Sequence, residues 1–299
     1  MSSQTYRLWI ATSLAIGSAS LSPIARSQIV PDTTLPLDSI STFENNTWTI
    51  EGGTAAGGNL FHSFSDFSLP TNTTAYFNNA LTVENIITRI TGGNISNIDG
   101  LLRANGAANL FLLNPNGIVF GPNARLDIGG SFVGSTADRI EFADGSSFSA
   151  TNPATSPLLT VSVPIGLQMG ATPGAIEVQG PGHGMSFVEE RLTSDRENRT
   201  LGLQVRPGRT LALLGGNIDL LGGNLTAIGD AVPGEATSIG GRVELGSVAA
   251  NSRVGLNPIA AGWQLGYEAV SAFQDIRLLN TASIDTSGAG AGAIHLQGR

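Results

Sequence analysis

The sequence contains no cysteine and no lysine, so its 15 basic side chains other than histidine are all arginines. Charged residues make up 13% of the 299 residues, against roughly 25% in an average globular protein. The formal net charge is −8, which gives no electrostatic support to binding of nucleic acid or of an anionic membrane surface. The sequence therefore predicts no nucleic-acid partner.

The same absences exclude several kinds of site. Without lysine there is no Gly-Lys-Ser/Thr phosphate loop, and no serine-centred nucleophile elbow is present. The three histidines, His62, His183 and His295, lie far apart in the sequence, and there is no cysteine to complete a zinc site. The "GAGAGA" stretch at 288–293 is better explained as a turn than as a dinucleotide loop. We predict no cofactor and no metal.

Glycine and proline are abundant instead, with 39 and 14 copies. With few candidate helices, this composition is typical of an all-β protein with many turns. One pattern, Gly-any-apolar-any-apolar-any-Gly, recurs as "GAIEVQG" at 174–180, as "GAIHLQG" at 292–298 and, nearly, as "GRVELGS" from Gly241. The alternation predicts short strands with one buried face. In the last copy, Ile294 and Leu296 should be buried and His295 should face solvent.

A second repeat gives the length of the unit. "LLGGN" occurs at 213–217 and again at 220–224, and Pro115 and Pro122 also stand seven residues apart. A strand and a turn in seven residues, three times over, make roughly 21 residues, the order of one turn of a parallel β-helix. The prolines then mark corners. About 200 residues of such a coil would form about ten rungs, each adding about 4.8 Å.

The residues at these corners suit tight turns. In Asn114-Pro115-Asn116-Gly117, followed by Ile118, the Asn, Pro and Gly stand where a type I turn prefers them. Gly121-Pro122-Asn123 is a second and weaker version. Proline lacks an N–H for a sheet ladder, so it belongs at corners.

The N-terminus has the pattern of an export signal. Arg7 precedes the apolar stretch "LWIATSLAIGSASL", which is too short and serine-rich for a membrane anchor. Ala25 and Ser27 then occupy the −3 and −1 positions for cleavage before Gln28. We predict a signal peptide at 1–27.

Segments beyond the signal peptide divide by composition. The aromatic-rich residues 28–80 are interpreted as a cap over the first rung, and a charged excursion is predicted at about 181–210, around "EERLTSDRENR". Residues 271–299 read as the start of further coil repeats that stop, apparently truncated, directly after a strand. An uncapped rung is a template for another strand.

A β-helix also admits an enzyme. Some β-helical proteins bind or cleave acidic polysaccharides with clustered aspartates, Ca²⁺ and arginine. Asp127, Asp219 and Asp285 each lie between apolar residues on a separate predicted strand. We interpret them as isolated, outward-facing side chains, and a secreted polysaccharide-binding or polysaccharide-cleaving protein stays the alternative.

Several stretches resemble a known family. "NLFHSFSDFSLP", "GGNISNIDGLLRANGAANLFLLNPNGIVFGPNARLDIGGSFVGSTAD" and "LLTVSVPIGLQMG" are similar to the secretion domain of two-partner-secretion exoproteins, the filamentous-haemagglutinin type. The 114–118 stretch resembles the family's hallmark motif, in a form common in cyanobacterial members. The resemblance runs from about Gln28 to beyond residue 250, and it implies a secretion domain at 28–270, although the family's other Asn-Pro-Asn-Leu motif is not found here.

This resemblance implies a right-handed parallel β-helix of the pectin-lyase type with an N-terminal cap. It implies export by the Sec machinery into the periplasm of a two-membrane bacterium. A partner outer-membrane β-barrel transporter with POTRA domains would then secrete the chain to the medium or the cell surface. The domain would seed folding of a haemagglutinin-like adhesin and would not be an enzyme. A host or neighbouring cell surface would be a partner only through a further C-terminal region.

Overall fold

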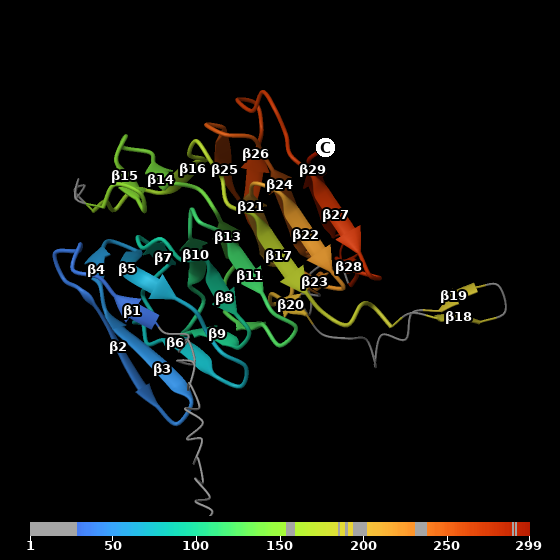
Figure 1. The fold of residues 1–299 in the computed structure, drawn as a ribbon, viewed down its shortest axis with the longest axis horizontal. Helices are drawn as coiled ribbons and strands as arrows, with labels where there is room; N and C mark the ends of the chain where they lie inside the picture. Colours follow the sequence, from blue (N-terminus) through green and yellow to red (C-terminus); the bar gives the residue numbers. More distant parts are fainter. Residues whose placement is uncertain are drawn as a thin grey trace, which may run out of the picture.

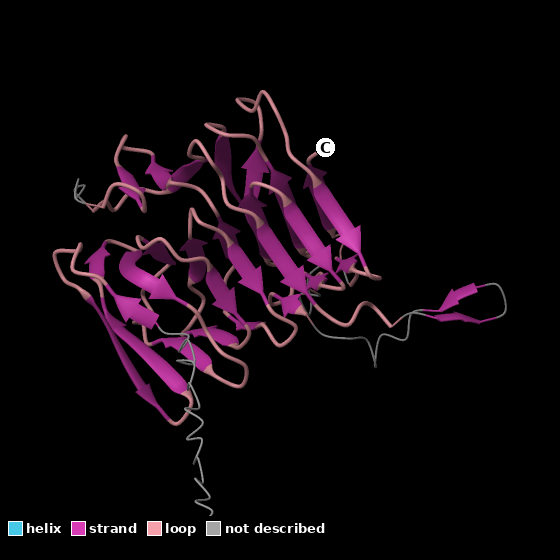
Figure 2. Cartoon of the chain, in the orientation of Figure 1, coloured by secondary structure: helices cyan, strands magenta, loops and turns pink. Residues whose placement is uncertain are grey.

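The computed structural model describes residues 29–153, 159–184, 186–188, 191–193, 202–230, 238–288, 290 and 292–299. Within these ranges the chain forms strands, turns and bends but no helix (Figure 2). Accordingly, this part of the chain contains no helix that is long and apolar enough to cross a membrane. The prediction of an all-β protein is confirmed.

Seven strands of the described chain pair in parallel and form the first face of a coil (Figure 1). In chain order they are β5 (Asn59–Phe67), β7 (Asn85–Ile90), β10 (Asn109–Leu113), β13 (Phe132–Ser135), β21 (Thr210–Gly215), β24 (Arg242–Ser247) and β29 (Ala293–Gln297). Parallel neighbours need a crossover between them. The strands of two further faces form that crossover.

The second face and the third face also pair in parallel. The second contains β8 (Ser96–Ile98), β11 (Ile118–Phe120), β17 (Ile176–Gln179), β22 (Ile218–Leu221) and β27 (Ile276–Leu279). The third contains β3 (Thr47–Gly52), β6 (Thr74–Phe77), β9 (Leu101–Ala104) and β12 (Arg125–Asp127), and then a separate sheet of β20 (Leu203–Gln204), β23 (Asn224–Thr226) and β28 (Ser283–Asp285). The chain visits the three faces in turn, so it winds as a parallel β-helix.

The register gives the length of each turn. Asn59 pairs with Asn85, and Asn85 with Asn109, so the first two turns take 26 and 24 residues. Leu110 pairs with Phe132, so the next takes 22 residues. These turns are close to the predicted length of roughly 21 residues.

The predicted number of rungs was wrong. The described chain has seven strands on the first face rather than about ten. Phe132 pairs next with Leu211, because long segments leave the coil between these two strands. The sequence analysis separated only the charged segment at about 181–210 from the coil, because β14 (Arg139–Phe142), β15 (Ser147–Ser149) and β16 (Pro164–Gln168) have the same alternation as coil strands.

Alternate residues of each first-face strand point to opposite sides. In β10, Leu110 and Leu112 belong to the core inside the coil, whereas Phe111 and Leu113 belong to a second core outside it. All four are fully buried. A strand buried on both faces reads as a continuous apolar run, which explains "NLFLL" before the first corner.

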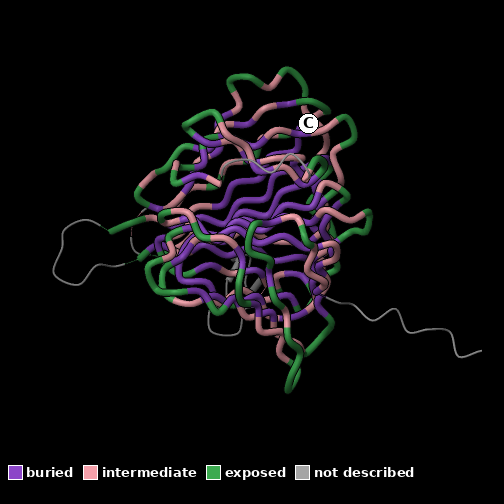
Figure 3. The backbone as a smooth tube through the Cα atoms, turned by 90° about the vertical axis from the view of Figure 1, so that its left-hand side faces the viewer, coloured by how far each residue is buried: buried purple, intermediate pink, exposed green. Residues whose placement is uncertain are grey.

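An antiparallel sheet covers the outer side of the first face. Its order is β15 (Ser147–Ser149), β14 (Arg139–Phe142), β16 (Pro164–Gln168), β25 (Arg253–Ile259) and β26 (Gly262–Gly266). Two segments far apart in the sequence build it, since β16 pairs with β25. Phe148, Leu167 and Trp263 from this sheet share the outer core with Phe111. Figure 3 shows the buried backbone of the stacked strands inside a shell of exposed loops.

Antiparallel strands accompany the first rungs. β1 (Ile29–Pro31) and β4 (Thr54–Ala56) run beside β5, and β2 (Ser39–Glu44) runs beside β3. Phe64, Phe67 and Phe77 pack together inside the coil. Strands β3, β5 and β6, from the segment expected to form the cap, already hold coil positions.

Part of the predicted charged excursion is described. β18 (Ser186–Val188) and β19 (Arg191–Thr193) form a two-stranded antiparallel sheet of their own. Figure 1 shows this hairpin away from the stacked coil. The neighbouring residues 189–190 and 194–201 lie outside the described residues.

The last rung differs from the sequence-based expectation. Ile294 and Leu296 are 49% and 44% exposed, although they continue the buried columns of Val243 and Leu245. His295 is instead half-buried against the preceding strand. The alternation was correct, but among the described residues β29 pairs with β24 alone, so its inward side chains meet solvent.

Candidate functional site

The first corner lies between β10 and β11, where the chain turns from the first face to the second. The N–H of Gly117 donates to the carbonyl oxygen of Asn114 at 3.1 Å, which closes a four-residue turn. Gly117 has a φ of +130°, which favours glycine. The N–H of Ile118, the first residue of β11, then donates to the carbonyl oxygen of Ala175 in the next rung at 3.1 Å.

The side chain of Asn114 joins this turn to the preceding rung. Its Nδ2 donates to the carbonyl oxygen of Asn94 at 3.0 Å and to Oγ of Ser96 at 2.9 Å. Its Oδ1 accepts from the backbone N–H of Asn116 at 3.0 Å and from Nδ2 of Asn116 at 3.1 Å. The residue is fully buried. Asn114 therefore uses both donors and its acceptor to fasten one corner to another.

The next rung packs directly on the other side of the corner. The N–H of Gly174 donates to the carbonyl oxygen of Pro115 at 3.0 Å. A Cβ atom added to Gly174 would lie 2.5 Å from the carbonyl carbon of Asn116 and the nitrogen of Gly117. The corners stack so closely that position 174 has room only for glycine.

Little of the motif faces solvent. Asn116 is exposed and Pro115 is half-buried, whereas Asn114, Gly117 and Ile118 are buried. Even Asn116 is engaged, because its Nδ2 donates to the carbonyl oxygen of Gly92 at 2.7 Å. In the folded chain, a partner could touch only the tip of the corner.

The second corner, Gly121-Pro122-Asn123, is held by a carboxylate that the sequence did not reveal. The backbone N–H of Asn123 donates to Oδ1 of Asp99 at 2.8 Å, and Oγ1 of Thr71 donates to Oδ2 of Asp99. Burial alone would raise the pKa of Asp99, but the hydrogen bonds from Thr71 and Asn123 outweigh it and lower the pKa. Three successive rungs meet at this carboxylate.

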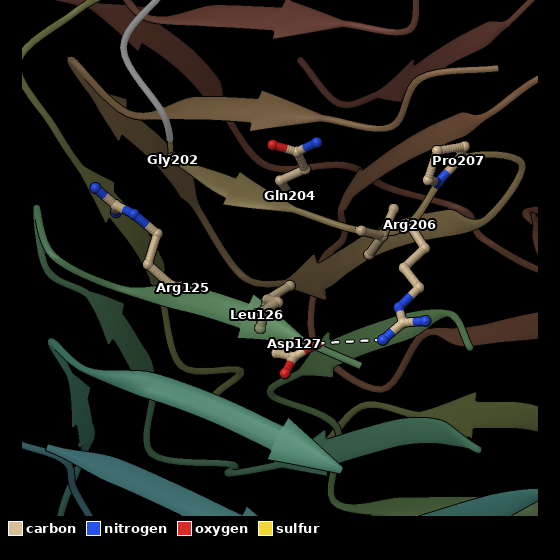
Figure 4. Close-up of a pocket in the computed structure, with 8 residues that line it drawn as sticks. Arg125, Leu126, Asp127, Gly202, Gln204, Arg206 and Pro207 are labelled. Carbon is tan, nitrogen blue, oxygen red and sulfur yellow. Dashed lines mark hydrogen bonds and ion pairs between the residues drawn. The ribbon is translucent and has the colours of Figure 1, made fainter. Parts of the chain in front are cut away.

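A shallow groove of about 280 Å³ lies where the third face is interrupted (Figure 4). β12 ends one sheet of this face and β20 begins the other, and the two strands are not hydrogen-bonded neighbours. Asp127 on β12 pairs across the gap with Arg206 at 3.3 Å and within its own sheet with Arg103 at 3.5 Å. All three side chains are about half exposed. Such solvated pairs contribute about 0–1 kcal/mol each and favour no proton-transfer chemistry.

The three candidate aspartates do not meet. Asp219 lies on the second face and pairs with Arg277 of the next rung, whereas Asp127 and Asp285 lie on separate sheets of the third face. No cluster of three metal-ligating side chains occurs among the described residues. Nothing in this arrangement favours the polysaccharide-cleaving alternative.

His62 is buried inside the first rungs of the coil. Its Nδ1 lies 3.0 Å from Oγ of Ser39, and its ring stacks on Phe64. Burial lowers the pKa of His62 to about 4, so the imidazole is neutral at neutral pH. A packed, neutral imidazole of this kind has a structural role.

A buried arginine joins three layers and was also missed. On the outer side of β7, Arg89 donates through Nε to Oγ of Ser63 at 2.9 Å and through Nη2 to Oγ1 of Thr34 at 2.8 Å. Both hydroxyls donate in turn to Asp32, and Nη1 of Arg89 reaches the carbonyl oxygen of Ser149 at 2.6 Å. Burial lowers the pKa of Arg89 to about 10, and nearby Asp32 opposes that shift. The N-terminal segment, the first face and the outer sheet meet here.

Three first-face strands begin with an asparagine, and the side chains of these asparagines form a hydrogen-bonded ladder. Nδ2 of Asn85 donates to Oδ1 of Asn59 at 3.0 Å, and Nδ2 of Asn109 donates to Oδ1 of Asn85 at 2.9 Å. The backbone N–H of Ser131 continues the ladder to Oδ1 of Asn109 at 2.8 Å. A signal existed for this ladder, because each asparagine directly precedes an apolar run in "NLFHSF", "NIITRI" and "NLFLL".

The predicted signal-cleavage residues, Ala25, Ser27 and Gln28, lie outside the described residues. The first described strand, β1, begins directly after them at Ile29. The cleavage site stays a prediction.

A family model and a solved structure are similar to this chain. The family model of the TPS secretion domain matches residues 27–296. Among solved structures, the chain is similar to the HMW1 secretion domain from Haemophilus influenzae, with 15% sequence identity and a TM-score of 0.46. That match covers 84% of this chain and 57% of the other, so this chain spans little more than half of its length. Among curated proteins no significant match was found.

Proposed function

Because the chain belongs to the family of TPS secretion domains, and so to the exported proteins of two-partner secretion, we propose how its fold serves that export. The mature chain is recognised by a dedicated outer-membrane β-barrel transporter with POTRA domains, which the chain reaches through the periplasm after Sec export. Outside the cell the coil forms first and seeds folding of a haemagglutinin-like adhesin. The module itself catalyses no reaction.

The observation that carries this proposal is the set of hydrogen bonds that join the first corner to the rungs before and after it. Asn114 bonds the rung before it, and Pro115 and Ile118 bond the rung after it. A rung that emerges from a pore can therefore dock on the previous rung without waiting for distant parts of the chain. Each docked rung buries apolar side chains, which would favour outward movement.

The buried position of Asn114 supports a role of the motif in folding. A transporter cannot contact this side chain once the coil has formed, because the residue has no exposed surface. We therefore infer that the motif acts on export by setting how readily the rung that contains β10 and β11 folds. Recognition before folding would involve the extended chain.

The experiment is secretion from a two-membrane bacterium with and without the cognate transporter. We expect the mature chain in the medium only with the transporter, and less of it for Asn114→Ala. The matched control is Asn257→Ala, an exposed asparagine on the outer sheet, which should be secreted like the wild type. Transporter-independent secretion would contradict the proposed partner, and wild-type secretion of Asn114→Ala would contradict the role of the corner.

A further inference from the structure

The asparagine ladder of the first face is covered at both ends by loops of the outer sheet. At one end, Nδ2 of Asn59 donates to the carbonyl oxygen of Thr160, in the segment before β16, at 3.0 Å. At the other end, Oγ of Ser131 donates to the carbonyl oxygen of Ala261, between β25 and β26, at 3.2 Å. Between these two contacts the ladder borders a groove of about 400 Å³.

The groove combines polar and apolar surface. Asn85 and Asn109 line it from the first face. Val163, which is 49% exposed, lines it from the segment before β16, and Ile259 and Trp263 line it from the hairpin of β25 and β26. A concave surface with apolar side chains and a few placed polar groups is the usual composition of a ligand site. All of the lining residues lie between 84 and 263, before the last rung.

Three polar side chains of the groove have unused hydrogen-bonding groups. The half-buried Arg209 and the exposed Glu84 both line it, and neither side chain forms a hydrogen bond or an ion pair with another described residue. Nδ2 of Asn85 has two N–H groups but donates to one described acceptor, Oδ1 of Asn59, although the residue is only 7% exposed. The groove thus offers a ligand a guanidinium, a carboxylate and an amide donor.

We propose that this groove binds a uronic-acid unit of an acidic polysaccharide outside the cell. The carboxylate of the sugar accepts charge-assisted hydrogen bonds from the guanidinium of Arg209. Its hydroxyl groups donate to the carboxylate of Glu84 and accept from Nδ2 of Asn85. The apolar C–H groups of the sugar ring lie against Val163 and Ile259, which removes apolar surface from water.

The mixture of free groups favours a sugar acid over other anionic ligands. A hydroxyl both donates and accepts, so it suits Glu84 as well as Asn85. Nucleic acid or an anionic membrane would bring many charges to a chain with a net charge of −8. An extended peptide needs an open strand edge, whereas β7 and β10 each have a hydrogen-bonded strand on both sides.

The groove binds the polysaccharide without cleaving it. Glu84 is the only carboxylate among the residues that line it, whereas glycoside hydrolysis generally uses a pair of carboxylates.

The first test is calorimetric titration of the purified mature chain with a galacturonic-acid trimer. We expect saturable binding to the wild type, and a Kd higher by about tenfold or more for Arg209→Gln, because charged hydrogen bonds to the ligand are lost. The matched control, Arg277→Gln, removes the same charge from the second face, where Arg277 pairs with Asp219, and should leave Kd unchanged. Added salt should weaken the binding.

The second test fills the groove without changing its charge. Ala107 is exposed and lines the groove, so Ala107→Trp should raise Kd by about tenfold or more and keep the wild-type thermal unfolding. A neutral galactose trimer should bind more weakly than the acid, and equally to the wild type and Arg209→Gln.

Several outcomes would overturn the proposal. They are a wild-type chain that does not bind the sugar acid, an equal rise of Kd in the two arginine variants, or an unchanged Kd in Ala107→Trp. A glutamate trimer that binds as tightly as the sugar acid would also overturn it, because the occupant would then be a peptide. None of these outcomes bears on the transporter.

Discussion

Single polar residues hold the turns of this coil together. Asn114, Asp99 and Arg89 are separated in sequence, yet each bonds groups from at least two turns or layers. Buried polar groups are costly when unpaired. Removing one such side chain leaves its hydrogen-bonding partners unpaired, so it should lower the free energy of unfolding more than a surface substitution does.

Asn114→Ala should lower the free energy of unfolding by about 2 kcal/mol, because it leaves the Asn94 carbonyl oxygen, Ser96 Oγ and the Asn116 N–H without a partner. Asn116→Ala should cost less, about 0.5–1 kcal/mol, since that side chain is exposed. Urea unfolding of the purified variants measures both. Equal losses would mean that burial of the Asn114 side chain carries no special weight.

His62 should make the coil sensitive to mild acid. Its pKa is about 4 in the folded chain and 6.5 as a free side chain, so the unfolded state takes up a proton first. Above pH 6.5, protonation of His62 costs the folded chain no stability. As the pH drops from 6.5 towards 4, the free energy of unfolding falls, by about 3 kcal/mol in all. Urea unfolding of wild type and His62→Gln from pH 7 to 4 measures the difference. Parallel profiles would refute the assignment.

At the scale of elements, the corners set how closely the rungs approach. Glycines in them fall into two kinds. Gly174 stands where a Cβ atom would meet the backbone of the neighbouring corner at 2.5 Å, whereas Gly93 has nothing within 4 Å of that position. Only the first kind is required by packing. Composition alone does not distinguish the two.

Gly174→Ala should destabilise the coil by about 2 kcal/mol, because backbone atoms of two rungs must separate to admit the methyl group. Gly93→Ala should change stability by less than about 0.5 kcal/mol, as surface substitutions usually do. Thermal unfolding of both variants makes the comparison. A destabilised Gly93→Ala would show that the effect comes from the loss of glycine itself.

At the scale of the whole molecule, two apolar cores share one sheet. The first face separates the core inside the coil from the core beneath the outer sheet. A polar side chain of the first face connects the layers. Arg89 on β7 bonds Thr34, which precedes the coil, and Ser149 of the outer sheet. Its guanidinium also lies over the ring of Phe148, 4.1 Å from the centroid.

Arg89→Met should lower the free energy of unfolding by about 3 kcal/mol, since Asp32 and the hydroxyls of Ser63 and Thr34 would lose their cationic partner. Faster hydrogen exchange should appear in both layers at once, at 29–38 and 139–150, and less in the last rung. Arg89→Lys keeps the charge without the planar guanidinium, so its free energy of unfolding should lie between those of the wild type and Arg89→Met. Exchange that rises evenly over the chain would argue that Arg89 does not connect these layers.

Short-range patterns in the sequence foretold the strands, the corners at Pro115 and Pro122, and the membership of the family. Each depends on a few neighbouring residues: alternation sets which side of a strand is buried, and proline and glycine limit the backbone angles of a turn. The asparagine before each apolar run was an available signal for the ladder of Asn59, Asn85 and Asn109.

Contacts between distant residues followed from the fold alone. The pairing of β16 with β25, the carboxylate of Asp99 beneath the second corner and the exposure of Ile294 all depend on which rungs become neighbours. Insertions of variable length separate those rungs in the chain, so spacing along the sequence carries no record of them. Local stereochemistry thus determines strand and turn, whereas burial and polar partnership are settled by how the turns stack.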